Sequence, residues 1–235
     1  MAKLNLIFLN KNEKQIKFRS FNYFFGRKYL ILTSIFLAME HPEQFEKEQL
    51  TINLTKANLI GLFIILPVGL IFGLPFYLLW KDMISITSIK TLTEEIIPDF
   101  TGSSFLLLIL FILGIIAHEL IHGITWSRFA SKGFNSIKFG VLWKMLTPYC
   151  HCKEPLKVKH YIAGALMPAI ILGIIPSLIS ILTGNTLLLF TGIFFTVVAA
   201  GDFMIVQLLY KEDMNDYVED HPSEAGCYIY RKRST

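Results

Sequence analysis

The sequence predicts an α-helical integral membrane protein with four transmembrane helices, both termini in the cytoplasm and a short hairpin between the second and third helices. Its 235 residues are 53% hydrophobic and only 17% charged, a composition atypical of a soluble domain. Four stretches reach the roughly 20 apolar residues that a membrane-spanning helix needs. Lys and Arg are abundant in some of the segments that separate these stretches and scarce in the others, which predicts a defined orientation.

The predicted spans contain helix-breaking residues. Proline removes a backbone hydrogen bond inside a helix, and its ring clashes with the preceding turn. We therefore expect kinks or breaks in the first span at Pro67 and Pro75, and in the third at Pro168 and Pro176. The four spans cover residues 57–80, 104–126, 161–183 and 186–210.

The basic residues predict the orientation. Of 22 Lys and Arg residues, nine lie in 1–56, seven in 127–160 and four in 211–235. By the positive-inside rule these three segments face the cytoplasm. The chain then consists of a basic cytoplasmic or interfacial segment (1–56), a membrane domain (57–210) and a cytoplasmic tail (211–235). The basic residues are expected to face anionic lipid headgroups, and no motif indicates nucleic-acid binding.

The second span carries a metal-binding pattern. His118, Glu119 and His122 fit H-E-x-x-H, in which two histidines four residues apart project from one face of a helix and can hold one metal ion. Glu119 then lies beside them and can take a proton from water that a zinc ion activates. The spacing therefore predicts His118 and His122 as zinc ligands and Glu119 as the catalytic general base.

The alternative is that these histidines only hydrogen-bond a neighbouring helix. A charged residue at bilayer depth costs about 2.5–3.5 kcal/mol on insertion scales. A glutamate without a role in such an apolar helix is therefore unfavourable, and we prefer metal ligation.

A catalytic zinc ion usually has three protein ligands, and two histidines with one carboxylate are a common set. Asp202 is the other acid within a predicted span. His118 precedes Trp126 by eight residues and Asp202 precedes Tyr210 by eight, so at 1.5 Å per residue both lie about 12 Å from the cytoplasmic boundary. Equal depth predicts Asp202 as the third ligand. The alternative is an acid that pairs with a hydroxyl or backbone group in helix packing.

Three segments resemble a known family: AHELIHG, GALMPAIILGIIP from Gly164 and AAGDFMIVQLL from Ala199. They are similar to the zincin peptidase membrane proteins, a family defined by a domain of unknown function and similar to the site-2 intramembrane zinc metalloproteases. The resemblance implies the same ligands, His118, His122 and Asp202, and the same base, Glu119. The Asn-x-x-Pro and Gly-x-x-x-Asn motifs of site-2 proteases are not matched, so no residue is assigned to polarise the substrate carbonyl.

The segment between the second and third spans predicts a hairpin at the membrane surface, bounded by Gly140 and Pro148. The resemblance implies that such a segment accepts substrate as an added strand, and we assign this role to 141–149 as a hypothesis. An interfacial hairpin anchored by Trp143 and Tyr149 is the alternative. Cys150-His151-Cys152 has metal-ligand spacing but lacks a second cysteine pair, so no separate zinc site is predicted there.

Together these features predict a membrane-embedded zinc endopeptidase, and the family resemblance implies a bacterial cytoplasmic membrane as its location. Its partners would be the lipid bilayer and a membrane protein or membrane-proximal peptide as substrate. A metal-binding protein without hydrolytic activity is one alternative, and the unassigned carbonyl-polarising group is its sign. A proton-linked transporter is another, because histidine and carboxylate side chains within a membrane also form proton relays.

Overall fold

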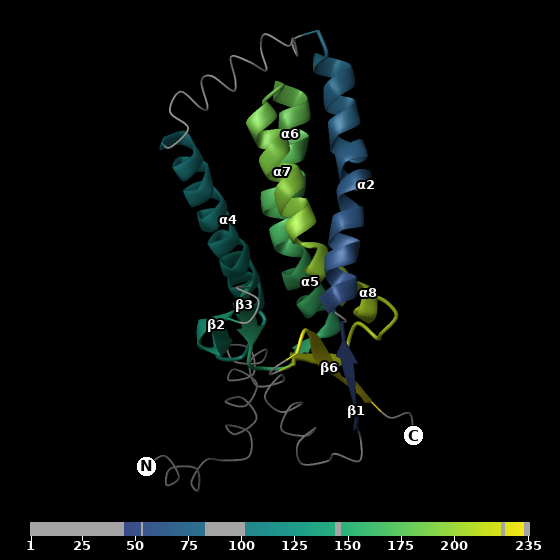
Figure 1. Ribbon diagram of the computed structural model, residues 1–235. Coiled ribbons are helices and arrows are strands. Elements are labelled where there is room, and N and C mark those ends of the chain that lie inside the picture. The colour runs from purple at the N-terminus through teal and green to yellow at the C-terminus, as the bar shows by residue number, and fades with distance from the viewer. Residues whose placement is uncertain (1–44, 53, 83–101, 144–146, 222–223, 233–235) are drawn as a thin grey trace, which may run out of the picture. The chain divides into compact units, whose positions relative to one another are not determined.

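The computed structural model describes residues 45–52, 54–82, 102–143, 147–221 and 224–232 (Figure 1). The chain divides into two compact units, Met1–Phe45 and Glu46–Thr235, and nearly all described residues belong to the second. Most of the predicted N-terminal segment 1–56 lies outside the described residues.

The helices account for the predicted spans. Among the described residues, three helices are long and apolar enough to cross a membrane, over Leu59–Trp80, Leu108–Ser127 and Val158–Thr183. A fourth span requires that α7 and α8 cross as a pair, because they meet at an angle of 45°. The helical elements are α2 (Leu54–Trp80), α4 (Gly102–Ser127), α5 (Val158–Pro168), the π-helical η3 (Ala169–Ile174), α6 (Ile175–Thr183), α7 (Thr186–Val198) and α8 (Ala200–Leu209).

The prolines affect the two spans differently. Helix α2 continues through Pro67 and Pro75 without a break. In the third span α5 ends at Pro168 and is followed by the π-helical η3 and then α6, so the regular α-helix is interrupted at this proline, as expected. The wider π turn lets the chain stay helical after a proline has removed a regular hydrogen bond. A bend that the sequence did not predict lies in the fourth span at Ala199, whose φ of −74° and ψ of 9° leave the helical region between α7 and α8.

In the part of the chain that the structure describes, two small sheets accompany the helices. The predicted hairpin is confirmed as β2 (Ile137–Leu142) paired antiparallel with β3 (Thr147–Cys152). A second sheet, which the sequence did not predict, has the strand order β1-β6-β5-β4. Its strands are β1 (Phe45–Thr51), β4 (Leu156–Lys157), β5 (Tyr217–Asp220) and β6 (Gly226–Lys232).

The four-stranded sheet lies at the ends of the helices that the sequence assigns to the cytoplasmic side (Figure 1). In β6, Cys227 and Ile229 are fully buried and their neighbours are partly exposed, which is the period-2 pattern of a strand with one covered face. Ile229 pairs with Val218 of β5, and both belong to one core with Leu156 and with Leu209 at the end of α8. The sheet is thus packed against the helix ends.

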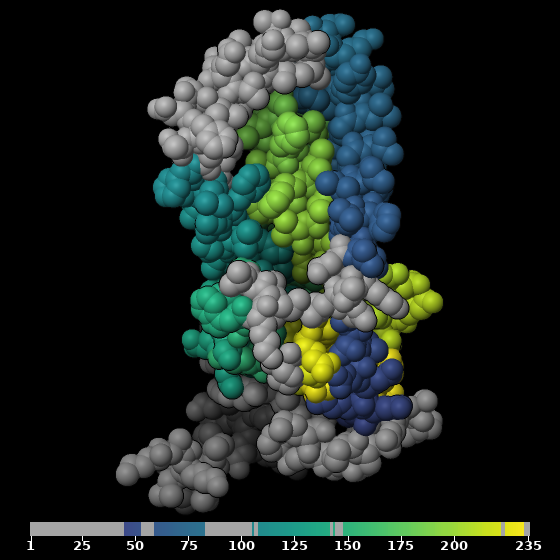
Figure 2. Space-filling view, viewed as in Figure 1, coloured from purple at the N-terminus to yellow at the C-terminus, as the bar shows by residue number. Residues whose placement is uncertain are grey.

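A separate apolar cluster joins the helices farther from the sheet. It contains Phe72 and Phe76 of α2 and Leu189 of α7, all buried. In Figure 2 the surface of α7 lies between α2 and α4. Large apolar side chains remain exposed on the outer faces of the helices, such as Phe63 at 68% and Phe105 at 63%, as expected of surfaces that contact lipid.

The turn after α4 is closed by a buried acid. Glu154 accepts hydrogen bonds from the Ser131 backbone N–H (2.8 Å), the Ser131 hydroxyl (2.5 Å) and the Ser136 hydroxyl (2.8 Å). Burial raises the pKa of Glu154, but the serine hydrogen bonds outweigh burial and hold this pKa below its ordinary value. The carboxylate therefore stabilises the fold above the ordinary glutamate pKa, and this stability is lost as the pH falls through the lowered pKa of the folded state.

We predict that Glu154→Gln lowers the free energy of unfolding by about 1–3 kcal/mol at pH 7, because the amide group would place a donor against the serine donors. Thermal unfolding in detergent, followed by circular dichroism at pH 7 and pH 4, measures the loss. The difference from wild type should shrink at the lower pH. The exposed Glu224→Gln is the control, and a Glu154→Gln protein as stable as this control at pH 7 would contradict the prediction.

Candidate metal centre

The second predicted span forms one side of the site. His118 and His122 lie one turn apart on the same face of α4, and both are buried at 5% and 4% exposure. Glu119 follows His118 on the same helix and is partly buried. An apolar helix thus directs three polar side chains toward the interior of the protein.

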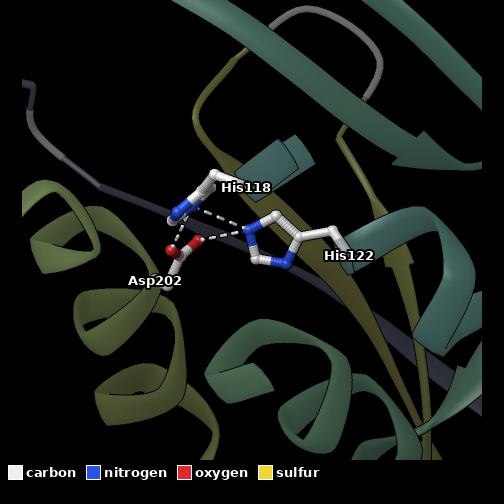
Figure 3. A group of neighbouring side chains, drawn as sticks. All are labelled: His118, His122 and Asp202. Carbon is white, nitrogen blue, oxygen red and sulfur yellow. Dashed lines mark hydrogen bonds and ion pairs between the residues drawn. The ribbon is translucent and has the colours of Figure 1, made fainter. Parts of the chain in front are cut away.

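Helix α8 supplies the opposite side. Asp202 lies in its first turn, three residues after the break at Ala199. Figure 3 shows the carboxylate of Asp202 facing both imidazole rings, which also face each other. Asp202 Oδ2 is 3.1 Å from His118 Nε2, Asp202 Oδ1 is 3.3 Å from His122 Nε2, and the two Nε2 atoms are 3.2 Å apart.

These separations fit a tetrahedral metal ion. Ligand atoms about 2.0–2.1 Å from a central zinc ion, at tetrahedral angles, lie roughly 3.3 Å from one another. The three side chains offer ligand atoms that all lie within 4.8 Å of each other. The donor set of two imidazoles and one carboxylate is also one that zinc accepts. The residues that the structure places together could therefore hold this metal.

The hydrogen bonding of His122 sets its tautomer. Its Nδ1 lies 2.9 Å from the backbone carbonyl of Gly164 on α5, so Nδ1 carries the proton that this bond requires. Nε2 is then left with a lone pair directed at Asp202 and His118. Outer partners of this kind fix the orientation of histidine ligands in metal sites.

Aromatic stacking holds the same ring. The imidazole of His122 stacks on the indole of Trp126, with ring centroids 5.0 Å apart and an interplanar angle of 16°. The indole occupies the space that a side chain at position 164 would need, since a Cβ added to Gly164 would overlap it. Glycine at this position therefore allows Trp126 to support the ring while the Gly164 carbonyl accepts its hydrogen bond.

Glu119 lies beside this group but is held from another direction. It interacts electrostatically with His118, His122 and Asp202, and it accepts a hydrogen bond from the backbone N–H of Cys150 on β3. The hairpin is consequently next to the site. Glu119 therefore neighbours the candidate metal ligands without being one of them. A side chain that takes a proton from water needs this position.

The thiols of the hairpin lie outside this group. Cys150 and Cys152 are buried. Burial, together with nearby carboxylates, raises the pKa of Cys152 to about 12, and the pKa of Cys150 is raised as well. Among the described residues, neither thiol belongs to a group of side chains that could together hold a metal ion.

All four residues predicted for the site lie together. The interval from Asp202 to Tyr210 that the equal-depth argument counted begins after the bend at Ala199 and lies almost wholly in α8. The supporting groups were missed, namely the Gly164 carbonyl, Trp126 and the Cys150 N–H. Only Trp126, one turn beyond His122, left a signal in the sequence.

Residues 111–217 match a protein family described as "Putative zincin peptidase". The matched segment contains His118, Glu119, His122 and Asp202, and it confirms the family resemblance. Neither a curated protein nor a solved structure matches the chain. The family supports a metallopeptidase, and the side-chain geometry supports a metal site at the same residues.

We predict that Gly164→Ala weakens metal binding, because the added methyl group must displace Trp126 and with it the ring of His122. Loss of a group that orients a metal ligand without binding the metal typically lowers metal affinity roughly 10- to 100-fold. Competition with a chromogenic zinc chelator measures this change. Gly201→Ala is the matched control, since it is adjacent to Asp202 but a Cβ there meets nothing within 4 Å. Equal affinities for the two variants would show that Gly164 has no such role.

Proposed function

From the match of residues 111–217 to the zincin peptidase family, we propose that the protein is a membrane-embedded zinc endopeptidase of the site-2 protease type. It would cleave peptide bonds in membrane proteins or membrane-proximal segments. The observation that carries this proposal is the convergence of His118, His122 and Asp202 within an apolar helical bundle, with Glu119 beside them.

In the proposed reaction His118, His122 and Asp202 hold the zinc ion. When bound, zinc would polarise the substrate carbonyl and lower the pKa of a water molecule toward 7. Glu119 takes the proton of the attacking water and delivers it to the amine nitrogen as the peptide bond breaks. The Cys150 N–H keeps the Glu119 carboxylate directed at this position between proton transfers.

The location of the site supports a substrate at or within the membrane. His118 lies nine residues before the end of α4 at Ser127, which at 1.5 Å per residue is about 13 Å into the helix. We propose that the end of the molecule with the sheets faces the cytoplasm, because the basic segments 127–160 and 211–235 belong to that end. Substrate would then reach the site from the cytoplasmic half of the bilayer.

The hairpin supports the proposal of an extended substrate. Strand β3 lies against the site through Cys150, and the hairpin presents exposed apolar side chains, including Trp143 at 79% exposure and Val141 at 39%. A peptide that is unwound near the membrane surface could lie along this element in the extended form that proteases cleave.

We predict near-stoichiometric zinc in the purified full-length protein and its loss in His122→Ala and in Asp202→Ala, because two protein ligands bind zinc far more weakly than three. Elemental analysis of detergent-purified protein makes the measurement. His160→Ala is the control, since its ring stacks on Phe129 and is not one of the proposed ligands. Glu119→Gln should keep the zinc and lose peptidase activity.

The outcomes separate the candidate functions. Loss of zinc in His122→Ala alone would show that Asp202 is not the third ligand. Zinc in the wild type without hydrolysis of any membrane substrate would indicate a metal-binding regulator. A folded wild-type protein without metal would refute the peptidase and favour a proton-linked transporter.

A further inference from the structure

Two groups of the candidate site are oriented from outside α4, each by a different element. The imidazole of His122 donates to the Gly164 carbonyl on α5. The carboxylate of Glu119 accepts from the Cys150 backbone N–H on β3. The position of α5 relative to β3 therefore sets the position of the His122 ring relative to the Glu119 carboxylate.

Asp220 joins these two elements directly. It is the last residue of β5 and is partly buried. Its Oδ2 accepts a hydrogen bond of 2.7 Å from the Cys152 backbone N–H on β3, and its Oδ1 accepts one from the Tyr161 hydroxyl on α5. The two hydrogen bonds reach one carboxyl group from two different elements, so Asp220 connects β3 to α5 without an intermediate residue.

The Tyr161 end of the link continues to the site. The phenol ring stacks on Trp126 with centroids 5.1 Å apart, and the Trp126 indole N–H donates to the Tyr161 carbonyl at 3.0 Å. Trp126 in turn stacks on His122. At the other end, Cys152 lies two residues from Cys150 in β3, and the N–H of Cys150 holds Glu119.

We propose that Asp220 is a positioning residue that sets the spacing between the His122 imidazole and the Glu119 carboxylate. This inference rests on the proposed function. It adds a residue that lies outside the segment 111–217 matched by the family, and so assigns the C-terminal sheet a part in arranging the site.

The same sheet offers a matched control. Glu219 adjoins Asp220 in β5 and accepts a hydrogen bond of 2.7 Å from the Tyr230 hydroxyl. This pair has the same chemistry, a tyrosine donating to a carboxylate, but it connects β5 only to β6. Asp220→Asn and Tyr161→Phe can therefore be compared with Glu219→Gln and Tyr230→Phe.

The experiment measures zinc affinity of the full-length protein in detergent by chelator competition, at a temperature where circular dichroism shows each variant folded. Asp220→Asn should raise the zinc dissociation constant on the order of tenfold, which is the low end for groups that orient metal ligands. The reason is that the asparagine amide group places an N–H donor against either the Cys152 N–H or the Tyr161 hydroxyl. Tyr161→Phe should have a similar effect. The double variant should bind zinc as tightly as the single variant with the lower zinc affinity, because both substitutions break the same link.

A spectroscopic measurement separates positioning from general stability. The visible absorption of the cobalt-loaded protein reports the geometry around the ion, and we expect it to change in Asp220→Asn and Tyr161→Phe but not in the two controls. If Asp220→Asn does not fold, Tyr161→Phe and its control Tyr230→Phe decide the question.

Equal zinc affinity and equal cobalt spectra in all four variants would overturn the inference and leave the proposed function intact. Weakening in all four would also overturn it, because general destabilisation of the sheet would then explain the loss. A wild-type protein that binds no zinc would overturn the proposed function, and the inference would fall with it.

Discussion

The contact of Asp202 with His118 and His122 is the constraint on which the arrangement of the helices depends. It joins α4 to α8, whose polar groups would each be costly in an apolar environment if left without a partner. Once the three side chains converge, their ligand atoms face one another, and a bound metal ion would compensate the carboxylate charge and accept the imidazole lone pairs. The two helices must therefore meet at this depth, and the remaining elements are arranged to allow it.

Close packing of α7 on the preceding helix sets where the chain turns toward the site. A Cβ at Gly173 in η3 would overlap Thr196, and one at Gly192 would overlap Ser177, so glycine at both positions lets the backbones approach. Ser177 and Thr196 bond carbonyls of their own helices at 2.8 Å, which leaves neither hydroxyl unsatisfied. This packing fixes the position of Ala199 along the preceding helix. Because the chain bends at Ala199, the packing also sets the position of Asp202.

The parts of the structure that the sequence predicted have strong local signals. The apolar stretches, H-E-x-x-H and a lone acid in the last span follow from length, spacing and the cost of burying charge. The bend at Ala199 was not predicted, because no proline lies next to it in the sequence. The sheet was missed because β4 has two residues and β1 (FEKEQLT) is charged on both faces, so its strands form only through pairing with segments distant in sequence.

The site consequently draws on both the helices and the hairpin. His118, Glu119 and His122 are carried by α4 and Asp202 by α8, and the Glu119 carboxylate also accepts a hydrogen bond from a backbone N–H of the hairpin. A metal ligand set needs rigid surroundings, and a proton-transferring carboxylate needs a fixed direction toward water and substrate. The helices position the ligands while the hairpin orients the base, and this arrangement requires a polar connection between helices and hairpin. Asp220, with one oxygen toward Tyr161 of α5 and the other toward β3, lies where that connection has to be made.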